Sequence, residues 1–256
     1  MIKLKISVIT INFNNAEGLQ KTIESVVNQK NALIEYLVID GGSTDRSVEL
    51  IEEHSGKIAY YVSEKDSGVY DAMNKGIKAS TGDYLIFLNS GDVFVSEDVI
   101  AEAVKVGFEA DLVSGNMIYN NNGERRKWIP ADQLTFSLFY FTGIPHPSTF
   151  IKRTLFDIVG LYDENLTIVS DWKFFILAAC KHSCSYQHID KFISEFSEDG
   201  MSSAPENIPT ILKEREQVIN DHFSAFMPDY EELWAAKKQL RKLRYTIKIK
   251  KFFGIR

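Results

Sequence analysis

Four polar residues, Asn89, Ser90, Gly91 and Asp92, directly follow the apolar run YLIFL at residues 84–88. This run is bounded on both sides by turn-forming residues, which predicts a buried central strand. Open α/β sheets bind ligands at the carboxyl ends of their strands, and a glycine there lets a large group approach the backbone. A carboxylate at this place suits a hard cation together with a phosphorylated ligand, since Mg²⁺ typically takes one or two carboxylates plus substrate phosphates. An ordinary turn would use the same residue types, so these four residues alone leave both interpretations open.

Three other polar loops follow predicted strands, and two of them lead into segments with helical spacing of apolar residues. Strands that alternate with helices imply right-handed crossovers and a mostly parallel sheet covered on both faces. The loops should therefore meet at one edge of the sheet, where nucleotide sites are built. Ser43 or Thr44 is placed to cap the second helix. The predicted strands are 5–11, 36–39, 58–62 and 84–88, the helices are 16–29 and 46–53, and the loops are 12–15, 40–45 and 64–70.

Neither of the glycine-rich phosphate-binding motifs, G-x-G-x-x-G and G-x-x-x-x-G-K-[ST], is present in the chain. Bound phosphates would therefore have to be neutralised in another way, and a cation held by Asp92 would do so.

Beyond Asp92 the alternation of strands and helices ends. The turn at residues 120–123 predicts a hairpin between strands at 112–119 and 125–129. The remaining expected elements are helices at 99–106, 153–159, 172–180 and 210–226, strands at 148–152 and within 186–196, and a last helix from about residue 231, after an interruption at Pro228.

The composition is that of an ordinary globular protein, with 45% hydrophobic and 25% charged residues among 256. No secretory leader precedes the first strand, and no apolar run approaches the roughly 20 residues of a membrane-spanning helix. Cys180 and Cys184 lack further ligands at zinc spacing, so a reduced, cytoplasmic compartment is expected.

The charge is unevenly distributed along the chain. Residues 237–256 hold nine of the 29 Lys and Arg residues and no Asp or Glu. The residues before them therefore carry 20 basic and 35 acidic side chains, a net −15. The acidic body argues against nucleic acid as a partner.

Several motifs occur in a characteristic order: SVITINFNN at 7–15, DGGSTD at 40–45, DSGVYDAMNKGI at 66–77, GDYLIFLNSGD at 82–92 and SDWKFF at 170–175. In this order the chain resembles the family 2 inverting glycosyltransferases over roughly residues 4–200. The resemblance implies an α/β fold of the GT-A type, a mostly parallel nucleotide-sugar-binding sheet between helices, followed by a C-terminal helical extension. The implied catalytic domain is 1–204, with a nucleotide-sugar half at 1–92 and an acceptor half at 93–204, and the extension is 205–256. DAMNKG and LNSGD are most similar to the branch that assembles bacterial capsule, exopolysaccharide and lipopolysaccharide.

The resemblance implies roles for residues on the donor side. Asp40 is expected to hydrogen-bond the nucleotide base, with Thr10 and Asn12 lining the base and ribose pocket, although Asp40 could instead cap a helix. Asp66 and Asn74 fall in the segment expected to close against the nucleotide and the sugar. Asn74 could equally tie its helix to neighbouring backbone.

The tip Asn89, Ser90, Gly91 and Asp92 falls at the family's D-x-D position and is assigned to the donor site. Members of the family often have Asp where this chain has Asn89 and Gly91. Asp92 keeps its carboxylate, so the resemblance implies a divalent cation, Mg²⁺ or Mn²⁺, with one protein carboxylate and with diphosphate oxygens and water completing the shell. The two departures leave the strictness of the metal requirement open.

Asp171 falls at the position of the family's general base, which deprotonates the acceptor hydroxyl as it attacks the anomeric carbon. The family usually has an acidic pair here, whereas this chain has Ser170 before Asp171. Asp171 could also cap the helix at 172–180, a role compatible with catalysis. His146 and Trp172 are assigned to the acceptor side. Either could instead be structural, and the 199–203 loop resembles the family's mobile loop or is a connector.

The C-terminal segment carries a separate signal. From Leu233 onward apolar residues recur at helical spacing between Lys and Arg residues, which predicts a basic amphipathic helix. Such a helix suits peripheral contact of residues 237–256 with an anionic membrane surface, each basic residue contributing about 1 kcal/mol at most. A packing helix for a partner subunit is the alternative.

Together these features predict a metal-assisted inverting glycosyltransferase that moves a sugar from a nucleotide-diphosphate donor to a hydroxyl of a lipid-linked glycan during surface polysaccharide synthesis. It is expected to be cytoplasmic, on the inner face of the cell membrane. The alternative is a non-catalytic GT-A module that binds a nucleotide sugar or a glycan.

Overall fold

The computed structural model describes residues 4–121, 123–198 and 200–252, without the side chains of 245–252. The chain divides into two compact units, residues 1–211 and 212–256. The sequence prediction puts the boundary between residues 204 and 205. Among the described residues, no helix combines the length and apolar character that crossing a bilayer requires.

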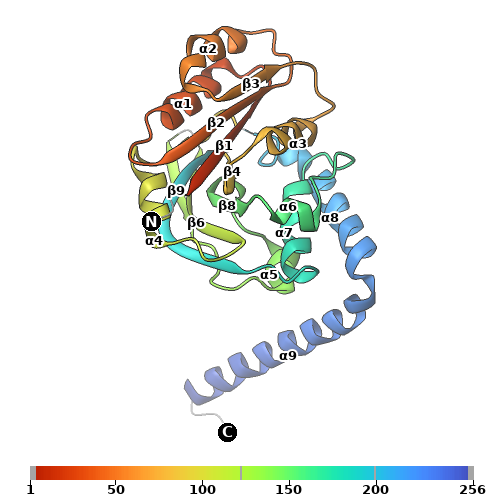
Figure 1. Ribbon diagram of the computed structural model, residues 1–256. Helices are drawn as coiled ribbons and strands as arrows, with labels where there is room; N and C mark the ends of the chain where they lie inside the picture. The colour runs from red at the N-terminus through yellow and green to blue at the C-terminus, as the bar shows by residue number, and fades with distance from the viewer. Residues whose placement is uncertain (1–3, 122, 199, 253–256) are drawn as a thin grey trace. The chain divides into compact units, whose positions relative to one another are not determined.

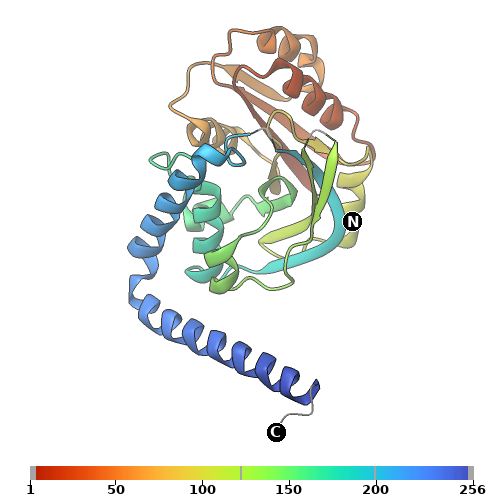
Figure 2. The same ribbon diagram turned by 180° about the vertical axis from the view of Figure 1, so that it is seen from behind.

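The first unit is built on a mixed sheet with the strand order β3-β2-β1-β4-β8-β6-β9-β5, with β7 paired to β6 (Figure 1). Its first half, β3-β2-β1-β4, is entirely parallel. The second half is mixed: β8 is antiparallel to β4 and β6, whereas β6 and β9 run parallel and side by side, as Figure 2 shows from behind. The strands are β1 (Lys5–Asn12), β2 (Leu33–Asp40), β3 (Tyr60–Ser63), β4 (Tyr84–Phe87), β5 (Val93–Phe94), β6 (Leu112–Asn121), β7 (Glu124–Trp128), β8 (Thr149–Lys152) and β9 (Tyr186–Ser197).

Helices cover both faces of this sheet. Residues of α1, α2 and α4 share one core cluster with alternate residues of the central strands, such as Val8 and Ile86. On the opposite face α3 packs so closely that a Cβ atom on Gly76 would lie 2.5 Å from Ile9, so only glycine fits there. The helices of the first unit are α1 (Ala16–Val27), α2 (Ser47–Glu53), α3 (Val69–Ala79), α4 (Val99–Val106), α5 (Phe136–Phe141), α6 (Leu155–Val159) and α7 (Ser170–Cys180).

Continuous burial along β1 and β4 fits the parallel half of the sheet. In β1 every residue after Lys5 is buried, as expected for a strand covered on both faces. The loops after β1, β2, β3 and β4 consequently leave from the same edge of the sheet, which is the arrangement predicted from the sequence.

The start of α2 and the C-terminal helices differ from the predictions. Neither Ser43 nor Thr44 caps α2. Asp45 instead accepts from the backbone N–H of Ser47 at 3.0 Å. Pro228 does not separate two helices, because it lies in the first turn of α9, where its missing N–H costs nothing. The helix α8 (Ile208–Phe223) crosses the boundary between the units, and a short 3₁₀ turn (Ser224–Phe226) and α9 (Met227–Phe252) follow it.

Candidate active site

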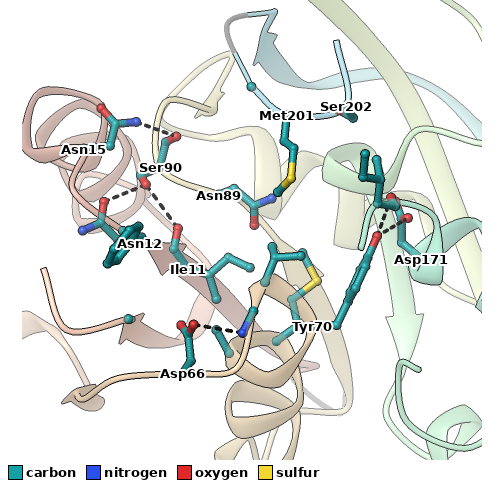
Figure 3. Close-up of a pocket in the computed structure, with 18 of the residues that line it drawn as sticks. Ile11, Asn12, Asn15, Asp66, Tyr70, Asn89, Ser90, Asp171, Met201 and Ser202 are labelled. Atoms are coloured by element: carbon teal, nitrogen blue, oxygen red, sulfur yellow. Dashed lines mark hydrogen bonds between the residues drawn. The ribbon is translucent and has the colours of Figure 1, made fainter. Parts of the chain in front are cut away.

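A cavity of about 870 Å³ opens in the first unit at the carboxyl ends of the parallel strands. Its lining comes from the loops after β1, β2, β3 and β4, from the start of α7 and from residues 196–197 and 200–202. Figure 3 shows Asn12, Asn15 and Ser90 on one side of it and Tyr70 with Asp171 on the other. Cavities of this size suit ligands as large as cofactors or nucleotides.

The loop after β1 and the tip after β4 are cross-linked by hydrogen bonds on one side of the cavity. Ser90 Oγ donates to Asn12 Oδ1 at 2.8 Å, and Asn15 Nδ2 donates to the Ser90 carbonyl at 3.2 Å. Asn15 also caps α1 by accepting from the N–H of Gly18. The two loops are therefore held as one surface, with Asn12 and Ser90 facing the cavity.

Asp40 supports this surface from beneath and does not line the cavity. It is fully buried, and its carboxylate accepts from Asn12, Ser43 and Ser63 and from the backbone N–H groups of Gly42 and Ser43. Burial alone would raise its pKa, but the hydrogen bonds outweigh burial and hold the pKa of Asp40 below its ordinary value. The following glycine pair, Gly41 and Gly42, does line the cavity.

Asp66 reaches the cavity from the loop between β3 and α3. Its Oδ1 accepts from the N–H of Gly68 at 3.1 Å. Burial raises the pKa of Asp66 above its ordinary value, and that hydrogen bond opposes the rise only in part. Lys65 is the single Lys or Arg among the described lining residues, against three carboxylates, those of Asp66, Asp92 and Asp171.

Besides Ser90, the tip after β4 presents two side chains with oxygen atoms, those of Asp92 and Asn89. Asp92 lines the cavity with 4% of its surface exposed, and its Oδ1 accepts from the N–H of Ser197 at 3.1 Å. Asn89 Oδ1 is buried without a hydrogen-bond partner. Gly91 has φ of +106° and donates its N–H to Thr22, so it shapes the tip through its backbone. The left-handed φ explains glycine here.

This donor set fits a hard cation that shares its shell with a ligand. Carboxylate and amide oxygens are the ligands that Mg²⁺ and Mn²⁺ prefer, and an orphaned buried amide oxygen near Asp92 is a position that a cation would satisfy. Within the described part of the chain, no three His, Cys, Asp or Glu residues form a metal-binding group. The protein alone therefore offers few ligands, as expected when substrate phosphates supply the others.

Asp171 lies across the cavity in the first turn of α7. It is the second residue of the helix, whose N-cap is Val169, so the capping role considered from the sequence is not found. Its side chain is 28% exposed and lines the cavity. Tyr70 Oη lies 3.0 Å from Asp171 Oδ1, and His146 Nδ1 lies 4.0 Å from Oδ2. The carboxylate is thus held on one oxygen and open on the side of the cavity.

His146 lines the cavity beside Asp171 but is itself 8% exposed. Its ring stacks on Phe87 at 4.9 Å, and its Nε2 lies 2.9 Å from Tyr162 Oη. Burial lowers the pKa of His146 below its ordinary value of 6.5, although the charge of Asp171 opposes this. The imidazole is therefore neutral at neutral pH.

Besides Asp40 and Gly91, three residues assigned from the sequence to ligand contacts do not line the cavity. Thr10 is fully buried and donates to the Leu88 carbonyl at 2.8 Å, because its position in β1 points into the core shared with α1. Trp172 is buried, and its Nε1 donates to the Phe139 carbonyl at 3.0 Å. For Trp172 the structure therefore matches the core alternative.

Asn74 is 1% exposed and makes the structural tie considered as its alternative role. Its side chain donates to the Tyr162 carbonyl and to Glu164, and it accepts from the Tyr162 N–H. It holds α3 against the loop before α7. Of the segment 199–203, Asp199 lies outside the described residues, while residues 200–202 line the cavity.

Sequence reasoning missed the partners of Asp171 and His146. Tyr70 and Tyr162 contact Asp171 and His146 from positions 101 and 16 residues away. Both tyrosines were visible as aromatic residues in polar surroundings, but no spacing rule links them to their partners. Lys65 also lines the cavity, and its position next to Asp66 in the sequence could have identified it.

Comparison with known proteins places this geometry in a family. The model of glycosyl transferase family 2 matches residues 7–162. An uncharacterised glycosyltransferase of Mycobacterium tuberculosis is 36% identical over 214 residues, which are 77% of this chain and 77% of that protein. A PGL/p-HBAD biosynthesis glycosyltransferase of Mycobacterium bovis is 30% identical over 200 residues, or 76% of this chain and 77% of the relative.

Solved structures share the fold at low sequence identity. Residues 1–349 of TarS of S. aureus, in complex with UDP-GlcNAc, superpose with a TM-score of 0.66 at 19% identity, covering 85% of this chain and 67% of that fragment. The mannosyltransferase PcManGT of Pyrobaculum calidifontis, in complex with GDP-Man and Mn²⁺, gives a TM-score of 0.61 at 15% identity, covering 89% of this chain and 65% of the other. The expected α/β fold of the GT-A type is confirmed.

Proposed function

The chain belongs to glycosyl transferase family 2 and is a glycosyltransferase, and on this premise we propose an inverting transfer of one sugar from a nucleotide-diphosphate donor to a hydroxyl of a glycan acceptor. The observation that carries the proposal is the position of the half-open Asp171 carboxylate on the same cavity as the Asn89–Asp92 tip. A base and a diphosphate-binding edge on opposite walls suit attack from the face opposite the leaving group.

The donor would lie along the loops after β1, β2, β3 and β4. Asn12, Asp66, Asn89 and Ser90 line this side, so we assign them direct donor contacts. Asp40, Asn74 and Gly91 would act through the backbone that they hold. His146 would line the acceptor side next to Asp171.

Asp92 and Asn89 would hold a divalent cation, Mg²⁺ or Mn²⁺, shared with the diphosphate. Such a cation supplies charge neutralisation for the departing diphosphate. The need for it follows from the lining, because three carboxylates and one lysine would otherwise repel a diphosphate.

In the transfer itself, Asp171 would accept the proton of the acceptor hydroxyl. The acceptor oxygen forms its bond to the anomeric carbon while the bond from that carbon to the diphosphate oxygen breaks, and the electron pair leaves with the nucleoside diphosphate. General-base assistance of this kind typically contributes about 10²–10⁴-fold.

The test is donor binding and turnover over a panel of UDP-, GDP- and dTDP-sugars with Mg²⁺, Mn²⁺ or EDTA. We expect one donor to bind and to be slowly hydrolysed with cation and not with EDTA. The Asp171→Asn variant should bind that donor normally and lose at least about 100-fold in turnover. Unchanged turnover in this variant would refute the assignment of the base, and binding of a donor that is never turned over would favour a non-catalytic binding module.

The C-terminal helix α9 supports a second proposal, peripheral contact with the cytoplasmic face of an anionic membrane. Its apolar residues Leu233, Leu240 and Leu243 are each at least half exposed, and nine Lys and Arg residues follow residue 236. This would bring the enzyme to a lipid-linked acceptor of surface polysaccharide synthesis. Flotation with phosphatidylglycerol vesicles should recover the protein at low salt, and phosphatidylcholine vesicles should not. Equal recovery with both, or a stable dimer without lipid, would favour the partner-helix alternative.

A further inference from the structure

Tyr70 connects the donor side of the cavity to the proposed base. It lies in the first turn of α3, directly after the loop that carries Asp66. Its ring is buried, 4% exposed, and packs against Tyr162 at 5.8 Å. Its hydroxyl lies 2.5 Å from the Ile168 carbonyl and 3.0 Å from Asp171 Oδ1. A single side chain therefore spans from α3 to both the loop before α7 and the first turn of α7 (Figure 3).

This contact leaves the two oxygens of Asp171 in different surroundings. Oδ1 receives the Tyr70 hydroxyl, and no other hydrogen-bond donor to this carboxylate is found in the described chain. Oδ2 faces His146 Nδ1 at 4.0 Å, which is too long for a hydrogen bond. One oxygen is anchored and the other remains available to an acceptor hydroxyl.

The hydroxyl of Tyr70 stays protonated throughout the working pH range. Burial, followed by the negative charge of Asp171, raises the pKa of Tyr70 well above its ordinary value. The hydroxyl has one proton and two acceptors, so it can donate to the ionised carboxylate before the reaction. Once Asp171 has taken a proton, the hydroxyl can donate to the Ile168 carbonyl instead. The hydroxyl thus has an acceptor in both states.

We propose that Tyr70 is a positioning residue that orients Asp171, so that Oδ1 is fixed and Oδ2 receives the proton of the acceptor hydroxyl. This inference rests on the proposed function of Asp171. The proton moves from the acceptor oxygen to Oδ2, and the acceptor oxygen bonds to the anomeric carbon. The bond from that carbon to the diphosphate oxygen breaks, and the nucleoside diphosphate leaves with the electron pair. Because Tyr70 directly follows the loop that carries Asp66, the start of α3 both lines the donor side of the cavity and holds Asp171.

The side chains that face Asp171 are uncharged at neutral pH. Those that face it are Tyr70 from α3, His146 from the 3₁₀ turn after α5, and Tyr162 from the loop before α7. Burial and the Asp171 charge raise the pKa of Tyr162, and burial lowers that of His146, so all three are uncharged at neutral pH. Removal of the Tyr70 hydroxyl should therefore free the carboxylate to turn, which lowers turnover without changing donor binding.

The experiment compares Tyr70→Phe with a matched control, Tyr84→Phe. Tyr84 is also buried, and its hydroxyl donates to a backbone carbonyl, that of Ala110, at 2.7 Å. It lies at the start of β4, away from the Asn89–Asp92 tip, and does not line the cavity. We expect Tyr70→Phe to keep the donor Kd within about twofold and to lose about 10–100-fold in kcat. Tyr84→Phe should lose comparable stability on melting and keep the wild-type kcat.

A double-mutant cycle separates positioning from folding. If Tyr70 acts through Asp171, adding Tyr70→Phe to Asp171→Asn should not lower the residual turnover further. A kcat for Tyr70→Phe equal to that of Tyr84→Phe, or an additive loss in the Asp171→Asn background, would overturn the proposal. A wild-type protein that binds donors but never turns them over would instead overturn the proposed function itself, before Tyr70 is changed.

Discussion

The buried carboxylate of Asp40 accepts five hydrogen bonds beneath the side of the cavity where the donor is proposed to bind. The Asp40→Asn substitution therefore tests how that side is held in place. Oδ1 accepts from Asn12 Nδ2 at 2.8 Å and from Ser43 Oγ at 2.6 Å. Oδ2 accepts from Ser63 Oγ at 2.6 Å and from the N–H groups of Gly42 and Ser43 at 3.2 and 2.9 Å. An asparagine has one acceptor oxygen and cannot receive all five.

The cost follows from the best orientation of the new amide. Its oxygen would replace Oδ2, where two fixed backbone donors point, and its NH₂ group would then face Asn12 Nδ2, another donor. One buried donor left without an acceptor costs about 1–3 kcal/mol, and the remaining bonds lose the assistance of the charge. Relief from burying a charge offsets part of this loss. We expect a net decrease of about 2–4 kcal/mol in the free energy of unfolding, or about 5–15 °C in melting temperature.

The difference in stability between wild type and Asp40→Asn should also depend on pH in a defined direction. The folded-state pKa of Asp40 is below its ordinary value of 3.8, so its ionised form stabilises the fold above that value. This contribution is lost as the pH falls through the folded-state pKa. The difference in stability between wild type and Asp40→Asn should therefore be largest near neutral pH and should narrow below about pH 4.

Urea unfolding between pH 3 and 8 measures this difference, and Asp111→Asn is the control. Asp111 also accepts from the N–H and hydroxyl of one serine, Ser185, but its side chain is 30% exposed. Its substitution should cost less than about 1 kcal/mol because water can replace the lost bonds. Donor affinity should fall in Asp40→Asn because Gly41 and Gly42 line the cavity. Equal stability of Asp40→Asn and wild type at pH 7 would refute the reasoning.

Three further substitutions test the neighbouring features. Asn89→Asp adds a carboxylate beside Asp92 and should tighten Mn²⁺ binding, followed by calorimetry, by about tenfold or more, whereas weaker binding would argue against a cation at the tip. Asn74→Leu leaves the buried N–H and carbonyl of Tyr162 unpaired and should destabilise the fold by about 2–5 kcal/mol in urea. Gly91→Ala forces a side chain to φ of +106° and should cost about 1–2 kcal/mol and weaken donor binding, a result that wild-type stability would contradict.

Local sequence patterns predicted helices and strands well where the burial of one face of the element determines its structure. The apolar spacing of residues 99–106 coincides with α4, and residues 16–29 contain α1, because each helix buries one regular stripe against the sheet. The expected edge with four polar loops follows from parallel connections alone. These features need no knowledge of distant contacts.

Roles of individual polar residues were harder to predict because distant partners decide them. Asn74 is held by Tyr162, 88 residues away, and Trp172 by the Phe139 carbonyl, 33 residues away. Either side chain would suit a ligand equally well by type. Ser43 does not cap α2 because its hydroxyl donates to Asp40, and Asp45, which precedes the N-cap Arg46, accepts from the N–H of Ser47 instead. Pocket-lining and core positions become distinguishable only when those partners are placed.

The replacement of a second tip carboxylate by Asn89 is consistent with a cation that arrives with the donor. Asp66, Asp92 and Asp171 already give the cavity an excess of negative charge over Lys65. A free diphosphate would meet repulsion of about 4 kcal/mol for each pair of like charges 4 Å apart at an effective dielectric constant near 20. A single carboxylate and an amide would in turn hold a free cation weakly. The cation would neutralise the charge that repels the diphosphate, and the diphosphate would supply the oxygen ligands that the protein lacks. Because such coupling is reciprocal, the affinity for either ligand should rise in the presence of the other by the same factor.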